Sequence, residues 1–528
     1  KLDNIYEKRG IRIELFEWED YDAAYNGMRK QDEYNERVRA SDMFLALFHK
    51  KAGKFTIEEF NIARKAFDEQ ASPKIYTYIK DLEAGESESR ELAEFKRLML
   101  EELGHYWCRY SNFDTMQLHF VLQLQMVEAT TPIKVEVKES QVKIGDSTIA
   151  DLNNVPFTSE NTTYRELQSR KEQLDREIGN AESGGRRGFF GQRSRTTDEE
   201  LANLREERES VTEQIERQEK ALVDTAMSIA RMQGGECSPR MRTAAELFEK
   251  GEIDKAGAVL KEDDMEADAT NAKLKFDTAA QPTAELTRNI ERCAGEYMLK
   301  ARIVVSGIAD ESRYRQAIKL MSTAIDLVSG RLPEETLAEY LFDYAVLLTD
   351  TGQQTKALET WERLSGIYER LYRKAPQKYA YGYAGVLNNM AVLYSDKGDF
   401  DHCLSKYLKA VDIYDRLNRE EPGIYDDDIA QIKNNLGTLY TDRDEYNKAL
   451  SEFNEAARIR FELLAKDNDP DSRSALADIY CNMATALQFS DHPQEALRYI
   501  AQAHAILDEL DKEFPRIYEY KLYSILNR

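Results

Sequence analysis

The chain has little of what builds disulfide frameworks or metal centres. Among its 528 residues are only five cysteines and six histidines. No two cysteines form a C-x-x-C pair, and none lies near a histidine at the spacing of metal ligands. This scarcity excludes a disulfide-stapled fold and argues against a zinc site, and the odd number of cysteines is typical of a reduced, cytoplasmic protein. We therefore expect no metal and no bound cofactor.

Long apolar runs and a positive charge balance are also missing. The longest clear apolar run, MFLALF, is far shorter than the roughly 18 residues that a membrane helix needs. The formal net charge is -24, so phosphates would be repelled over most of the surface. The sequence therefore predicts neither a membrane protein nor a general nucleic-acid binder.

Residues 1–128 alternate short apolar runs with helical patterns. The runs RIELFEW, DMFLALFH and KIYTYIK are rich in β-branched and aromatic residues, which predicts strands, and amphipathic stretches lie between them. Alternation of strand and helix predicts an α/β domain with a parallel sheet and helices on both faces. In such sheets, ligands bind beyond the carboxyl ends of the strands.

Residues 129–160 change character. Polar and apolar residues alternate around Gly145 and Asp146, which predicts a β-hairpin connector. Residues 161–235 then show two charged helices with heptad-spaced apolar residues, a helical hairpin.

The tip of that helical hairpin, ESGGRRGFFGQRSR, lacks the G-K-[ST] of a phosphate-binding loop. It is either a mobile turn or a contact point for an acidic partner or another subunit. Four candidate partner-binding residues stand out there: Arg186, Arg187, Phe189 and Phe190.

Residues 236–528 repeat a pattern of paired helices. One small position recurs about every 46 residues, at Ala345, Ala391, Gly437 and Ala484. A second recurs in the following helix, at Ala357, Cys403, Ala449 and Ala496. Five residues before each of these stands a residue suited to positive φ: Gly352, Gly398, Asp444 and Asp491. The pattern resembles tetratricopeptide repeats with lengthened helices, and it predicts an all-α solenoid of about six units.

Repeat arrays of this kind bind partners more often than they catalyse. Amide side chains recur just before the first small position, at Asn388, Asn389, Asn434, Asn435 and Asn482. Because amides both donate and accept, they either clamp a protein or peptide ligand in the groove or hydrogen-bond the neighbouring repeat.

Glu59, in the segment FTIEEFNIARKAF, admits two interpretations. On a helical wheel Phe60, Ala63 and Phe67 mark the buried stripe. Glu59 then flanks the core and Glu58 points to solvent. Thr56 as N-cap with Glu59 at N3 is a capping box, which needs no catalysis to explain it.

The order of SDMFLALF, FTIEEFNIA and KIYTYIK resembles the bacterial branch of the Toll/interleukin-1 receptor (TIR) superfamily, over roughly residues 1–126. The resemblance implies a flavodoxin-like domain that cleaves NAD and releases nicotinamide. The family's catalytic glutamate, in the helix after the third strand, matches Glu59, with Glu58 as the runner-up. Trp18 and Glu19 fall where a mobile loop flanks the nucleotide site, and the family's first strand is expected before Lys1.

Together these resemblances imply a TIR-like effector joined to a tetratricopeptide-repeat array, similar to bacterial TIR–TPR anti-phage defence proteins. NAD is then the substrate, a protein or peptide is the ligand of the array, and the TIR-like domain self-assembles. Two alternatives stay open. One is a non-enzymatic TIR–TPR signalling scaffold, and the other is a nucleoside deoxyribosyltransferase-like enzyme, which shares the sheet order and uses a glutamate nucleophile.

Overall fold

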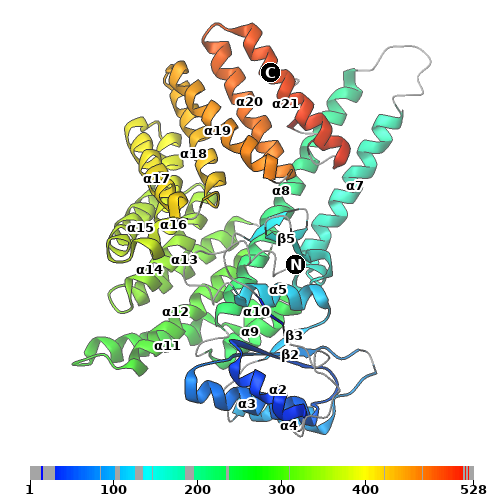
Figure 1. Ribbon diagram of the computed structural model, residues 1–528, viewed down its shortest axis with the longest axis vertical. Coiled ribbons are helices and arrows are strands. Elements are labelled where there is room, and N and C mark those ends of the chain that lie inside the picture. Colours follow the sequence, from blue (N-terminus) through cyan, green and yellow to red (C-terminus); the bar gives the residue numbers. More distant parts are fainter. Residues whose placement is uncertain are drawn as a thin grey trace. The chain divides into compact units, whose positions relative to one another are not determined.

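The chain folds into two compact units. In the computed structural model (Figure 1) the described residues are 13–15, 30–83, 85–101, 107–124, 135–138, 140–144, 147–184, 195–232, 237–307, 310–420, 422–466, 468–514, 518, 521 and 522. The first unit is built from described residues within 1–127, 132–166 and 215–259, and the second from those within 128–131, 167–214 and 260–528. None of the described helices is long and apolar enough to span a membrane.

The first unit contains a parallel sheet with the strand order β1–β2–β3. Its strands are β1 (Met43–Phe48), β2 (Lys74–Lys80) and β3 (Cys108–Tyr110). Its helices are α2 (Lys30–Ala40), α3 (Lys54–Gln70), α4 (Arg90–Glu101) and α5 (Phe113–Leu124). The prediction of a parallel sheet is confirmed, with β1 and β2 in the expected segments. The strand predicted over RIELFEW is wrong for its described part, because residues 13–15 form no strand.

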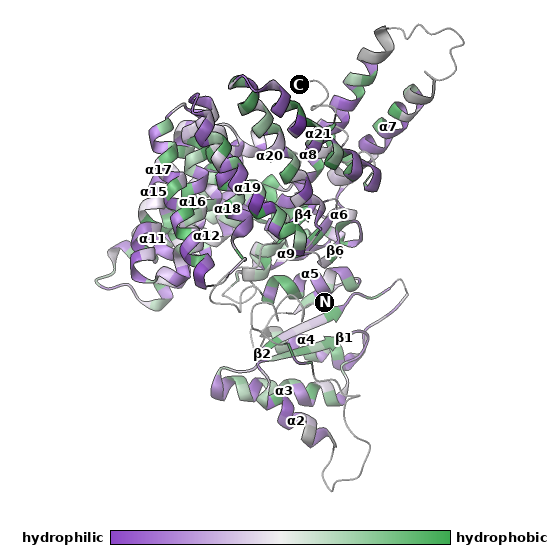
Figure 2. Ribbon diagram, turned by 45° about the horizontal axis from the view of Figure 1, so that its top comes forward, coloured by the Kyte–Doolittle hydropathy of each residue, from purple (hydrophilic) through white to green (hydrophobic). Residues whose placement is uncertain are grey.

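Helices cover both faces of this sheet (Figure 1). One face packs on α2, α3 and α4, and its apolar core is Val38, Phe44, Ala46, Phe48, Ala52, Phe60, Ala63, Ile79, Leu92, Phe95 and Met99. The ring of Phe95 lies 4.9 Å from that of Phe48 and 5.0 Å from that of Phe60. On the other face the α5 residue Phe120 meets Tyr76 edge to face at 6.3 Å. Figure 2 shows β1 as hydrophobic along its length. On the α5 side of the sheet, however, Leu45 and Leu47 of β1 are 37% and 50% exposed, so that face is covered only in part.

An antiparallel sheet follows where the β-hairpin was predicted. It has three strands rather than two, β4 (Glu136–Lys138), β5 (Gln141–Ile144) and β6 (Ser147–Asp151), in that order. The turn at Gly145 and Asp146 lies outside the described residues. A 3-10 turn, η2 (Leu152–Asn154), and a short helix, α6 (Pro156–Ser159), come next.

Helices α9 (Pro239–Glu249) and α10 (Ile253–Val259) belong to the same unit as this sheet. Phe248 of α9 stacks on Phe157 of α6 with ring centroids 5.5 Å apart. At Gly251, where φ is +78, a Cβ would lie 2.6 Å from the carbonyl oxygen of Pro156, so only glycine fits. The first helix pair of the repeat region is therefore anchored on the segment that follows the antiparallel sheet.

The helical hairpin predicted before the repeats is present. Its helices are α7 (Thr162–Gly184) and α8 (Arg195–Met232). Arg208 Nε on α8 donates to Asp175 Oδ1 on α7 at 2.7 Å, and Arg170 pairs with Glu207 at 2.5 Å. The four residues singled out at its tip, Arg186, Arg187, Phe189 and Phe190, lie outside the described residues.

The second unit contains the predicted solenoid of paired helices. The helices are α11 (Glu262–Thr278), α12 (Ala284–Val305), α13 (Glu311–Val328), α14 (Glu334–Asp350), α15 (Gln354–Lys374), α16 (Pro376–Asp396), α17 (Phe400–Glu420), α18 (Asp426–Asp442), α19 (Tyr446–Lys466), α20 (Pro470–Phe489) and α21 (Pro493–Glu513). From α12 to α21 they pack in consecutive pairs, and each helix carries hydrophilic residues beside hydrophobic ones (Figure 2).

The small positions and turn positions read from the sequence are confirmed. Ala345, Ala391, Ala357, Cys403 and Ala449 are fully buried, and Gly437 and Ala484 are buried as well. All four turn residues have positive φ: 69° at Gly352, 70° at Gly398, 61° at Asp444 and 65° at Asp491. The amide after each donates to a carbonyl five residues back at 2.8 to 2.9 Å. The helices α14, α16, α18 and α20 thus each end in a left-handed Schellman turn.

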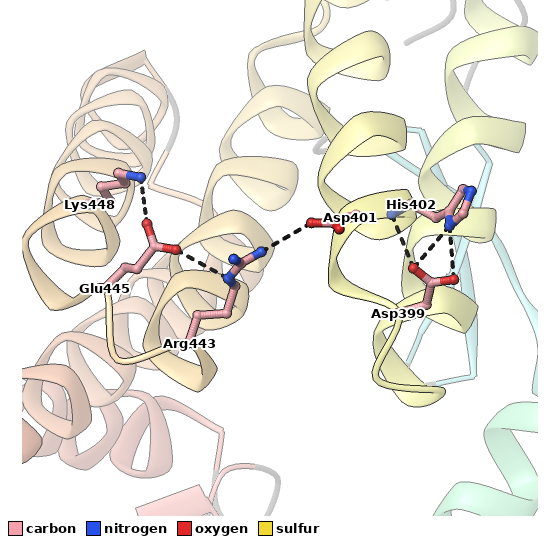
Figure 3. Close-up of polar contacts among 6 residues, drawn as sticks. All are labelled: Asp399, Asp401, His402, Arg443, Glu445 and Lys448. Atoms are coloured by element: carbon pink, nitrogen blue, oxygen red, sulfur yellow. Dashed lines mark hydrogen bonds and ion pairs between the residues drawn. The ribbon is translucent and has the colours of Figure 1, made fainter.

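These turns carry charged and polar side chains. Figure 3 shows six of them at the turns of two neighbouring repeats: Asp399, Asp401, His402, Arg443, Glu445 and Lys448. Arg443 reaches Glu445 at 3.1 Å and, across the repeat boundary, Asp401 at 3.4 Å. Because the Asp401 side chain is 94% exposed, solvent screens the pair, and it contributes little to stability. The charged side chains drawn in Figure 3 are therefore surface residues of the turns, and we do not assign them a binding role.

Gly398→Ala is expected to lower the free energy of unfolding by about 1 kcal/mol. A Cβ at Gly398 would meet nothing within 4 Å, so the cost comes from the left-handed backbone alone. Gly398→Asn is the matched variant, and it should cost less because asparagine tolerates this conformation. Urea unfolding followed by circular dichroism measures both, and equal costs for the two variants would contradict the backbone explanation.

Candidate functional site

Helix α3 carries both candidate catalytic carboxylates. Its N-cap is Gly53, in an extended conformation and without a side-chain cap bond. The helix therefore begins at Lys54, and Thr56 lies inside it rather than at its start. The predicted capping box of Thr56 and Glu59 is wrong, so helix capping does not explain Glu59.

Glu59 is held by the helix that precedes β1 in the chain. Gln31 Nε2 on α2 donates to Glu59 Oε1 at 2.8 Å and to Asn35 Oδ1 at 3.2 Å. Asn35 Nδ2 in turn donates to Glu58 Oε1 at 2.9 Å. The two amides are 2% and 4% exposed, whereas both glutamates are half-buried. The prediction that Glu58 points into solvent is wrong, because α2 covers that flank of α3.

The surroundings of Glu59 favour its protonated form more than water does. Partial burial is the main cause and raises the pKa of Glu59 above its ordinary value. The hydrogen bond from Gln31 lowers that pKa, and the negative charge of Glu58 raises it again. A carboxylate tuned in this way is typical of functional sites, although structural polar networks produce such shifts too.

The other two residues predicted for the nucleotide site, Trp18 and Glu19, lie outside the described residues. The structure therefore brings together only Glu58 and Glu59 of the predicted set. It adds Gln31 and Asn35, whose spacing of four along α2 places both amides on one face of that helix.

A second cluster of polar side chains lies on the parallel sheet and was not predicted from the sequence. The ring of His119 on α5 lies between Cys108 Sγ, at 3.0 Å from Nε2, and Tyr78 Oη, at 3.2 Å from Nδ1. No local pattern joins these residues, because β2, β3 and α5 each supply one. Burial raises the pKa of the Cys108 thiol well above its ordinary value, and Glu249 adds to the shift. A protonated, buried thiol is a poor nucleophile, so the arrangement is read as structural.

The asparagines of the repeat array are half-buried. Asn482 Nδ2 donates to Asn434 Oδ1 at 3.1 Å, which joins α20 to α18 of the neighbouring repeat. Asn435 hydrogen-bonds the Tyr407 hydroxyl of α17. Asn388 differs, because its Oδ1 is buried without a hydrogen-bond partner among the described residues. Asn434, Asn435 and Asn482 thus make contacts between repeats, whereas the Oδ1 of Asn388 is buried away from solvent.

Comparison with known protein families supports the prediction of tetratricopeptide repeats in the second unit. Residues 429–471, which cover most of α18 and α19, match the tetratricopeptide repeat family. No curated protein sequence matches the chain. The comparisons identify no TIR domain, so the TIR-like assignment of residues 1–128 stays a prediction.

Three solved structures illustrate the likeness. The apo form of RapI is 16% identical, with 67% of this chain and 79% of that chain covered and a TM-score of 0.38. NprR in complex with its cognate peptide NprX is 14% identical, with 68% and 82% covered and a TM-score of 0.29. A signal transduction ATPase with a tetratricopeptide repeat sensor from Pyrococcus horikoshii is 12% identical, with 93% and 86% covered and a TM-score of 0.31.

Proposed function

We propose that this chain is an effector that cleaves NAD at the nicotinamide bond when a protein or peptide ligand engages its repeat array. The observation that carries the proposal is the setting of Glu59. This half-buried carboxylate has a raised pKa, accepts a hydrogen bond from a buried amide, and lies in the first two turns of the helix after β1. The TIR-like resemblance of residues 1–128 supplies NAD as the substrate.

One carboxylate suits this chemistry. Breaking the bond between nicotinamide and ribose develops positive charge on the ribosyl centre, and an adjacent carboxylate stabilises that charge. Partial burial strengthens the interaction, because the local dielectric is lower than in water. Since the charge of Glu59 is lost as the pH falls through its raised pKa, cleavage should weaken on the acid side.

In this proposal the repeat array regulates the activity of the N-terminal unit by binding a ligand. Stacked repeats form extended concave surfaces that suit protein and peptide ligands. The TIR-like resemblance suggests that the trigger acts by assembling the N-terminal units. Anti-phage defence in the cytoplasm is the setting that the same resemblance suggests.

The test is nicotinamide release from NAD by the purified 528-residue protein, measured by chromatography. It is run on the dilute protein and on protein assembled by crowding. Release that depends on assembly supports the proposal. Release by the dilute protein, with exchange of bases on deoxynucleosides, would favour the deoxyribosyltransferase-like alternative.

A non-enzymatic scaffold is the second candidate. The match of residues 429–471 to the tetratricopeptide repeat family favours it, because repeat arrays of this kind present binding surfaces whether or not the N-terminal unit is an enzyme. Absence of nicotinamide release in every assembled state would leave the scaffold as the better description.

A further inference from the structure

Two buried amides on α2 connect the two carboxylates of α3. The hydrogen-bonded order is Glu59, Gln31, Asn35, Glu58, with distances of 2.8, 3.2 and 2.9 Å between successive partners. Gln31 uses both hydrogens of its Nε2, one for Glu59 and one for Asn35. The amides are therefore committed to the carboxylates rather than to the backbone of either helix.

This arrangement leaves one polar atom without a partner. Gln31 Oε1 is buried and accepts no hydrogen bond among the described residues. Such an orphan acceptor costs on the order of 1–3 kcal/mol. Turning the amide over would place Oε1 against Glu59 Oε1, and two acceptors would then repel each other. The charge-assisted bond to Glu59 therefore fixes the amide in the orientation that leaves Oε1 unpaired.

An apolar side chain at position 31 would avoid that cost. Buried polar networks with one unsatisfied member are less stable than well-packed apolar residues of similar size. Stability alone therefore does not explain a glutamine that is 2% exposed beside Glu59. A buried polar atom without a hydrogen bond is often explained by a functional role. Here that role would be to hold the carboxylate of Glu59 in place.

We propose that Gln31 is a positioning residue, which, with Asn35 behind it, fixes the Glu59 carboxylate toward the ribosyl centre of a bound nucleotide. The proposal rests on the proposed function for the reaction itself. Gln31 does not touch the reacting atoms and acts through Glu59. Among the described residues, the side chains that shift the pKa of Glu59 are Gln31 on α2, which lowers it, and Glu58 on α3, which raises it.

The experiment follows the pH dependence of nicotinamide release by the 528-residue protein. Gln31→Met keeps the length of the side chain but removes both donors, so the pKa of Glu59 should rise further and the acid limb of nicotinamide release should move to higher pH. Glu58→Gln removes the neighbouring charge and should move the same limb to lower pH. At neutral pH, Gln31→Met should also lower kcat on the order of 10- to 100-fold, with KM little changed.

A second readout does not depend on activity. Carbodiimide couples nucleophiles to carboxyl groups with a pH dependence that follows their protonation, and peptide mass spectrometry reports the labelling of Glu59 alone. The midpoint of labelling should shift upward in Gln31→Met and downward in Glu58→Gln. Glu36→Gln, an exposed change on α2, is the control and should shift neither. Gln31→Asn, which retracts the amide, replaces Gln31→Met if the latter does not fold.

The pH dependence of nicotinamide release and the labelling of Glu59 together distinguish the positioning role of Gln31 from the proposed NAD cleavage. Opposite shifts in both readouts support the positioning role. Unshifted labelling in a folded Gln31→Met overturns it, even if activity falls equally at every pH, because that result describes a structural residue. Opposite labelling shifts without nicotinamide release in the wild type support Gln31 as the group that holds Glu59 and reject the proposed NAD cleavage.

Discussion

Glu59→Gln is expected to lower nicotinamide release from NAD by at least about 100-fold, the scale seen when one preorganised stabilising group is removed from a transition state. The variant's side-chain oxygen still accepts the hydrogen bond from Gln31, so the fold should stay nearly intact. Only the negative charge is lost, and the ribosyl centre requires that charge. Nicotinamide release and melting temperature are measured together for the wild type and the variant.

Two controls accompany this variant. Glu69→Gln removes an equal charge from an exposed position near the end of α3 and should leave release unchanged. Glu58→Gln decides between neighbours, because Glu58 is half-buried and accepts a hydrogen bond from Asn35, the amide next to Gln31 in the same network. Loss of release in Glu58→Gln alone would transfer the catalytic role to Glu58. Full release in Glu59→Gln would end the proposal for Glu59.

Features that depend on a few neighbouring residues could be predicted from the sequence. Positive φ at Asp444 and Asp491 is one case, because an aspartate replaced glycine at the same offset from a small residue in the repeat. The burial of Cys403 is another, since it occupies an alanine position. The strand β2 also followed directly from KIYTYIK, whose apolar character needs no partner to be recognised.

The setting of Glu59 could not be predicted in the same way. The pattern T-x-x-E occurs at helix starts and inside helices alike, and only the extended backbone of Gly53 shows where α3 begins. The helical wheel placed Glu58 in solvent because it considered only packing on the sheet. Gln31 lies 28 residues before Glu59 in the chain, so their bond arises from the packing of α2 on α3 and leaves no local signal.

Gly437→Leu is expected to lower the free energy of unfolding of its repeat on the order of 3 kcal/mol. Gly437 lies in α18, and a Cβ there would fall 2.4 Å from the ring of Phe453 on α19. Phe453 is fully buried, so its ring has no space into which to move. Because each repeat packs mainly on its neighbours, the damage should centre on α18 and α19. Hydrogen exchange along these two helices is the measurement, with urea unfolding of the whole chain beside it.

The matched comparison uses a single substitution at two glycines. Gly385 also lies inside a repeat helix, α16, but a Cβ there would meet nothing within 4 Å. Gly385→Ala should therefore stabilise the protein by about 0.5–1 kcal/mol, because alanine favours a helix interior. Gly437→Ala gains the same helix propensity, yet should destabilise, because its methyl group collides with Phe453. Opposite signs for one chemical change show that close approach of α18 and α19 requires glycine at 437, and like signs would refute that packing.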